Sequence, residues 1–191
     1  EMFNKIREIV EQAQEYGFSV ENAEVNTKVF SGTIVGPTVE EFTKVVAAAV
    51  ESGEASTKID GETVMNAASI QLKIKLETAD LILLCGDATP EYLHNLDIYN
   101  VIQLPHHGKL ESAKKIFDAL EDSYSKEYLI SDNTGSGETS GGSDDTVEYM
   151  KDERYSPALN TKNKIVDIPS SGAIAIRETR RVKLGEMDSK C

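Results

Sequence analysis

The chain has 191 residues, 39% of them hydrophobic, which is enough to build the core of one domain. It carries 33 acidic and 20 basic side chains, giving a formal net charge of -13. Because electrostatic binding of nucleic acid requires clustered lysines and arginines, this balance does not support a long nucleic-acid groove. No apolar run approaches the roughly 18 residues that cross a bilayer, and two cysteines are too few for a disulfide framework. We therefore expect no membrane span and a cytoplasmic setting.

Hydrophobic periodicity predicts helices and strands that alternate along the chain. Helices are expected over residues 2–16, 38–53, a short segment from 89, 113–120 and 143–150. Strands are expected near residues 25–29, 32–37, 70–76, 81–85, 101–104, 128–130, 164–168 and 173–177. The polar residues 51–63 should form a surface connection. This order of elements predicts an α/β fold.

Three segments carry further information about burial. Residues 70–76 alternate apolar and polar side chains, so one face of this strand should be buried and the other solvated. Residues 81–85 are continuously apolar, as expected for a strand covered on both faces. Almost every residue from 131 to 146 is Ser, Thr, Gly, Asp or Asn, a composition that predicts a flexible loop.

Two short segments that follow predicted strands have the composition of functional loops. In the first, Asp87 follows Gly86 at the end of the apolar strand, where its carboxylate could bind a metal ion or only cap a turn. In the second, Pro-His-His-Gly places His106 and His107 at the end of the next strand. Imidazole is a common metal ligand, although such a pair can also be two exposed loop residues. The two loops are separated by one helix and one strand, which favours a shared site.

Residues 79–88, which include Gly86-Asp87, and residues 103–108, which include Pro-His-His-Gly, resemble the metallo-β-lactamase superfamily. The likeness is strongest to its ComEC-type competence-protein branch. Residues 35–37 and 66–72 are similar to upstream strands of that family, and residues 128–131 and 171–176 are similar to its closing strands. The resemblance covers roughly residues 24–178.

The resemblance implies an αββα sandwich, an α+β sandwich of which residues 1–191 would be the C-terminal part, half or more of the whole. It also implies a centre of two divalent metal ions, zinc or manganese, that activates water to hydrolyse esters, amides or phosphodiesters. Asp87 would bridge the two metals, and His106 or His107 would be a metal ligand or would donate a proton to the leaving group. His94 matches no motif of the family and is expected to lie on the surface.

The family's primary metal motif, H-x-H-x-D-H, is absent, and the chain has three histidines in total. The family's late histidine is also absent, and the loop 131–146 takes its place. Asp132, Asp144 or Asp145 could substitute for it, but a solvated loop is the simpler interpretation. The resemblance therefore implies a metal site that is incomplete in this chain.

Two explanations of the incomplete site follow. In the first, a complementary N-terminal half or a partner polypeptide carries H-x-H-x-D-H. In the second, the chain is a degenerate, non-catalytic relative that binds or regulates a partner. We favour the first, because the resemblance begins in the middle of the fold. A half sandwich would also expose the apolar inner face of its sheet, which must then be covered.

The functional hypothesis is accordingly part of a metal-dependent hydrolase. Metal-activated water would attack a phosphodiester or another ester in a small anionic substrate, with Asp87 and the two histidines on this side of the site. Nucleic acid as a substrate is suggested by the ComEC-type likeness and is not supported by the charge. The alternative is a binding or regulatory module of the same fold without turnover.

Overall fold

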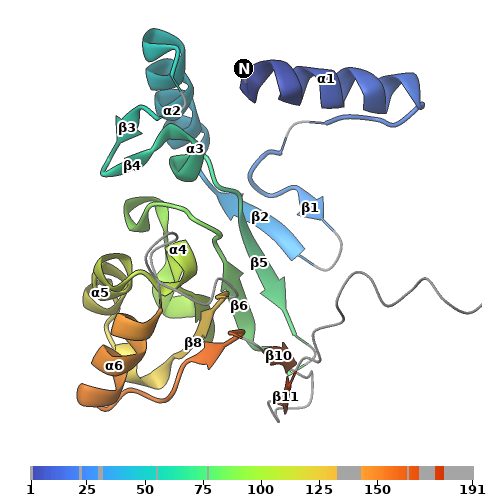
Figure 1. The fold of residues 1–191 in the computed structure, drawn as a ribbon. Coiled ribbons are helices and arrows are strands. Elements are labelled where there is room, and N and C mark those ends of the chain that lie inside the picture. Colours follow the sequence, from blue (N-terminus) through green and yellow to red (C-terminus); the bar gives the residue numbers. More distant parts are fainter. Residues whose placement is uncertain are drawn as a thin grey trace, which may run out of the picture.

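The computed structural model describes residues 2–21, 23–29, 32–54, 56–76, 78–132, 143–162, 164–167 and 175–178. Within these residues the chain forms a mixed α/β fold with six helices and a seven-stranded mixed sheet (Figure 1). The predicted alternation of helices and strands is therefore confirmed. Most of the predicted 131–146 loop, together with the predicted strand residues 168, 173 and 174, lies outside the described residues.

Six α-helices are described: α1 Met2–Glu15, α2 Val39–Ser52, α3 Val64–Ala67, α4 Pro105–Gly108, α5 Leu110–Ala119 and α6 Asp144–Asp152. Three single 3-10 turns lie at Pro90–Tyr92, Leu96–Ile98 and Ser123–Ser125. The predicted capping box of α2 is confirmed, because the Thr38 hydroxyl accepts from the Glu41 backbone N–H and the Glu41 carboxylate accepts from the Thr38 N–H. In the described part of the chain, no helix has the length and apolar character needed to span a membrane.

The main sheet has the strand order β1-β2-β5-β6-β7-β8-β9. Its strands are β1 Lys28–Val29, β2 Gly32–Gly36, β5 Gln71–Lys75, β6 Leu81–Leu84, β7 Val101–Gln103, β8 Glu127–Ile130 and β9 Leu159–Asn160. The pairs from β1 to β6 are antiparallel, whereas β6, β7, β8 and β9 run parallel. Two hairpins are separate sheets: β3 Lys58–Ile59 with β4 Glu62–Thr63, and β10 Lys164–Asp167 with β11 Ala175–Glu178.

One face of the parallel strands packs against α5 and α6 (Figure 1). Leu83, Ile102 and Tyr128 lie side by side in the register of β6, β7 and β8, and all three belong to the main hydrophobic core. From the helices, Ile116, Phe117 and Met150 complete this core. These helices form a layer that covers one face of the sheet and buries its apolar side chains.

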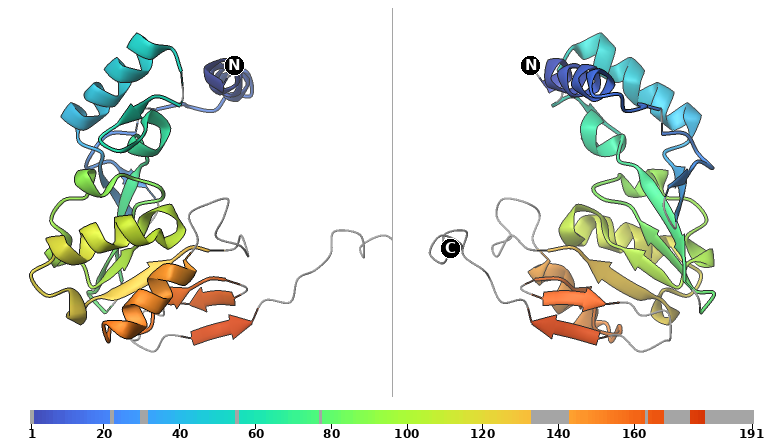
Figure 2. Two further views of the ribbon diagram at one scale, coloured as in Figure 1. Left: turned by 60° about the vertical axis from the view of Figure 1, so that its left-hand side comes forward. Right: turned by 90° about the vertical axis from the view of Figure 1, so that its right-hand side faces the viewer.

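The opposite face of the sheet is also apolar. By strand alternation and register, it carries Ile34, Leu72, Ile74, Ile82, Leu84, Val101 and Leu129, which we call the open face. Its residues lie outside both hydrophobic core clusters. Ile34, Ile82 and Val101 are nevertheless buried, whereas Leu72, Ile74, Leu84 and Leu129 are only half-buried. The right-hand view of Figure 2 looks toward this side, and no described helix lies across β5, β6 and β7 there.

Two local predictions are wrong, and one segment has more regular structure than expected. In β5 the polar residue Gln71 is buried at 2% exposure and its apolar neighbour Ile70 is 53% exposed, because the Gln71 amide donates to the Tyr92 carbonyl. Thr89 does not cap the turn that follows it, since its hydroxyl donates to Glu91 and to the Asp60 carbonyl. The predicted surface connection 51–63 contains the β3-β4 hairpin.

Candidate functional site

The candidate loops lie at one edge of the sheet because of how the strands run. Strands β6, β7, β8 and β9 are parallel neighbours, so their carboxyl ends meet at the same edge. Asp87 follows β6, the two histidines follow β7, and Ser131 and Asp132 follow β8. The predicted loops are therefore brought to one edge, and a third loop from β8 joins them.

The Pro-His-His-Gly segment forms a single turn of unusual backbone conformation. His106, His107 and Gly108 all have positive φ, at 53°, 55° and 81°. Left-handed conformations cost about 1–2 kcal/mol for residues other than glycine and are normally isolated. Such strain in consecutive residues persists only where the surroundings hold it, and it is concentrated at functional sites.

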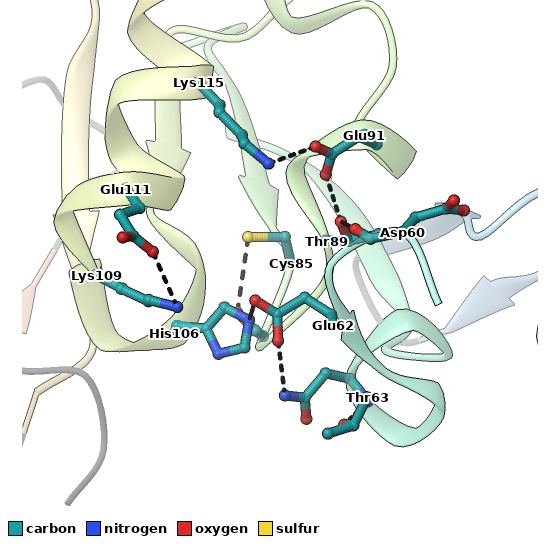
Figure 3. A network of polar contacts seen from close by, with 12 residues as sticks. Asp60, Glu62, Thr63, Cys85, Thr89, Glu91, His106, Lys109, Glu111 and Lys115 are labelled. Atoms are coloured by element: carbon teal, nitrogen blue, oxygen red, sulfur yellow. Dashed lines mark hydrogen bonds and ion pairs between the residues drawn. The ribbon is translucent and has the colours of Figure 1, made fainter. Parts of the chain in front are cut away.

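The first of the two histidines, His106, points away from the strand edge toward the β3-β4 hairpin. Its Nε2 atom lies 3.1 Å from Oε1 of Glu62, and the two side chains are only 12% and 16% exposed. The contact lacks the angle of a directed hydrogen bond, and it is an ion pair only when the imidazole is protonated. Figure 3 shows this pair. The other carboxylate oxygen of Glu62 accepts from the Asn66 amide.

The second histidine is held in a defined tautomer. Nδ1 of His107 hydrogen-bonds to the backbone carbonyl of Ser131, which can only accept, so Nδ1 carries the hydrogen. In the neutral ring, Nε2 of His107 then carries a lone pair. Metal-ligating and proton-transferring histidines are commonly oriented in this way by a carbonyl on the other nitrogen. Of the two candidates, His107 has the arrangement of a functional imidazole.

Asp87 lies in the turn after β6 and is half-buried. It is near enough to the Cys85 thiol for its charge to contribute to a raised thiol pKa, after the larger effect of burial. No hydrogen bond or ion pair joins Asp87 to His106 or His107, all three of which the structure describes. The structure thus places Asp87 at the predicted edge without a direct contact to either histidine.

The side chain of Gln103, the last residue of β7 before the histidine loop, connects the loops that follow β6 and β8. Its Oε1 accepts from the backbone N–H groups of Cys85 at 3.0 Å and Gly86 at 3.3 Å. Its Nε2 donates to the Ser131 hydroxyl at 2.9 Å. Since two N–H donors require an acceptor, the orientation of this amide is fixed by its neighbours.

Asp132, which follows Ser131 after β8, belongs to a buried polar network, so the expectation of a solvated side chain is wrong for this residue. Asp132 is 2% exposed and accepts from the hydroxyl of Ser143, which is itself buried and also accepts from the Asn160 amide. Residues Asp144 to Thr146 form the first turn of α6, which confirms the predicted helix 143–150, and the Thr146 hydroxyl donates to the Gly108 carbonyl. These side chains therefore tie α6 to the strand edge.

A polar pocket of about 380 Å³ lies on the other side of Glu62. The charged side chains at its rim form ion pairs with one another: Lys109 pairs with Glu111, and Lys115 pairs with Glu91, as Figure 3 shows. Asp60, also on this rim, accepts from Lys44 and Tyr92, and these hydrogen bonds hold the pKa of its carboxyl below the usual value. This pocket therefore offers no surplus of positive charge for an anion.

The metal expectation can be tested against the donors at the strand edge. Asp87 and His107 are suitable donors for zinc or manganese, but His106 is directed to Glu62. Over the described ranges, no group of three or more His, Cys, Asp or Glu side chains is arranged to hold a metal ion. These residues do not by themselves complete a metal site.

His94, as expected, lies on the surface, where it pairs with Glu41 at 2.6 Å.

Cys85 is expected to be chemically inert in the folded chain. Its thiol is fully buried, it donates to the Gln103 carbonyl at 3.0 Å, and burial raises the pKa of the thiol. In a Cys191→Ser variant, a thiol reagent at pH 8 should label Cys85 only after denaturant is added, as measured by intact-protein mass spectrometry. Rapid labelling of the native variant would contradict this burial.

No family model, no curated protein and no solved structure matches this chain.

Two features of the site had only a weak signal in the sequence. Gln103 is a polar residue in the otherwise apolar segment 101–104, which marks it as unusual without indicating its partners. Glu62 belongs to a polar surface segment and pairs with a residue 44 positions away, so its sequence neighbours give no sign of that contact.

Proposed function

We propose that this chain supplies one side of a metal-dependent hydrolytic centre of the metallo-β-lactamase type. In this proposal Asp87 and His107 are the metal-facing residues, and the remaining ligands come from a complementary polypeptide that carries H-x-H-x-D-H. The fold would then be half or more of an αββα sandwich. The metal pair would be zinc or manganese, the reaction hydrolysis of a phosphodiester or another ester, and the substrate small and anionic.

The observation that carries the proposal is the hydrogen bond from His107 Nδ1 to the Ser131 carbonyl. It leaves the Nε2 lone pair available at the strand edge where Asp87 also lies. A metal ion bound there would polarise a substrate oxygen or activate water. The chain's own contribution is to orient the imidazole through the Ser131 carbonyl and to hold the Asp87 loop against β7 through Gln103.

The open face supports the need for a second polypeptide. β6 and β7 carry both the candidate loops and the apolar residues Ile82, Leu84 and Val101 of that face. A complementary sheet packed there would bury the half-exposed Leu72, Ile74, Leu84 and Leu129 and would lie along the same strands that lead to the site.

A second function is favoured by one observation. The open face carries half-buried apolar side chains that a partner could cover, as expected of a binding or regulatory module of the same fold without turnover. In that case the open face would bind a partner and the histidine loop would serve only to shape the edge of the sheet.

Metal content distinguishes the two functions. We expect the chain alone to bind Zn²⁺ or Mn²⁺ weakly, and the chain with a polypeptide carrying H-x-H-x-D-H to bind about two equivalents, because metal binding requires the whole ligand set. Elemental analysis after gel filtration measures this. Absence of metal from a stable complex would contradict the enzyme proposal and support the binding module.

Replacing Asp87 by alanine in such a complex should remove one or both metal equivalents and reduce ester hydrolysis by at least about 100-fold. Asp80→Ala is the matched control, because Asp80 precedes the same strand at its opposite end and its carboxylate accepts only from the Thr78 hydroxyl within the described residues. Unchanged metal content and hydrolysis in Asp87→Ala would show that Asp87 is not a ligand of the metal site.

A further inference from the structure

The side chain of Gln103 reaches two of the three loops of the candidate site, those after β6 and β8, from the end of the strand that leads into the third. Its amide oxygen receives the backbone N–H groups of Cys85 and Gly86, which directly precede Asp87. Its amide nitrogen reaches the hydroxyl of Ser131, whose carbonyl accepts from His107. Thus Gln103 links the Asp87 loop to the group that orients His107.

The contacts of Gln103 are specific to an amide of this length. Removing the oxygen leaves two backbone donors without their acceptor, and removing the nitrogen frees the Ser131 hydroxyl. Within the register of the sheet, Gln103 pairs with Leu129 and faces the same side as Leu84, so an apolar side chain would also fit there. The polar choice at this position is therefore not explained by packing on the open face.

We propose that Gln103 is a positioning residue: by fixing Ser131, it holds His107 as the Nδ1–H tautomer with its Nε2 lone pair at the Asp87 edge. This inference rests on the proposed function, because that function makes the Asp87 edge a metal-binding site. The coupling between Gln103 and the His107 ring can be measured in the chain alone, without a metal ion or a partner.

The test is the ring-nitrogen NMR spectrum of His107 in the full chain without metal, at a pH where the imidazole is neutral. In the wild type we expect one protonated Nδ1 and one unprotonated Nε2. In Gln103→Met, which keeps the side-chain length and removes both polar atoms, we expect loss of this single tautomer and averaged ring-nitrogen shifts. Gln103→Glu, which retains an acceptor for both N–H groups and for a rotated Ser131 hydroxyl, should restore the wild-type pattern.

Two controls distinguish a specific effect on the position of His107 from a general loss of stability. Gln71→Met removes a buried amide elsewhere in the same sheet, one that donates to the Tyr92 carbonyl, and should leave the His107 signals unchanged. The ring signals of His94 should be unchanged in every variant. Ser131→Ala removes only the hydroxyl that Gln103 reaches and provides the same test if Gln103→Met does not fold.

An unchanged His107 tautomer in Gln103→Met, or in Ser131→Ala where that variant is needed, would overturn the inference. Equal changes in Gln71→Met would overturn it as well, because they would show a general effect of stability. Since the spectrum is recorded without metal, a failed metal-binding test of the proposed function leaves this result standing. Conversely, if metal binds and the tautomer is unchanged in the variant, the proposed function stands and Gln103 does not position His107.

Discussion

Gly108→Ala is expected to destabilise the fold by about 2–4 kcal/mol. Gly108 has φ +81°, and a Cβ atom there would lie 3.1 Å from three side-chain atoms of Ile130, which is fully buried. The substitution would thus add left-handed strain to an overpacked core contact. Because His106 and His107 share the same strained turn, the loss should be accompanied by altered His107 ring signals.

Gly53→Ala is the matched control for this prediction. Gly53 has a similar φ of +69° at the end of α2, but nothing lies within 4 Å of the position of its Cβ. It should cost only the conformational strain, about 1 kcal/mol. Urea unfolding followed by circular dichroism gives both values, and equal losses at the two positions would show that the contact with Ile130 is easily relaxed.

Asp132→Ala is expected to cost about 3 kcal/mol, because it leaves buried donors without their acceptor. The Asp132 carboxylate accepts from Ser143 at the start of α6, and the Asp132 carbonyl accepts from Thr161 after β9. The side chain therefore joins the end of β8 to α6, and the contact of the backbone carbonyl with Thr161 remains in the variant. The same urea experiment measures the change.

Asp144→Ala supplies the comparison for Asp132. Asp144 follows Ser143 in the chain, but its side chain is 74% exposed and pairs with Lys162 on the surface. Exposed ion pairs contribute about 0–1 kcal/mol, so this variant should remain close to the wild type in stability. A loss at Asp144 as large as that at Asp132 would contradict the assignment of the network to the interior.

The sequence by itself determined the secondary structure and the two main loops. Periodicity and capping signals located α1, α2, α5 and the strands from β5 to β8, because such signals depend on residues a few positions apart. The sequence did not give the strand order, but the loops Gly86-Asp87 and Pro-His-His-Gly after apolar strands indicated where polar side chains would meet. Burial was less predictable, as Gln71 and Ile70 show, since a tertiary hydrogen bond decided which of them lies inside.

Only the tertiary structure distinguished the two histidines. They are adjacent in the chain and identical in chemistry, yet a turn of three left-handed residues directs His106 to Glu62 and His107 to Ser131. The partners lie 44 and 24 residues away, and Gln103 reaches Ser131 across 28. Local patterns carry no information on such pairings, because they are fixed by the parallel register of β7 and β8 and by the position of the β3-β4 hairpin.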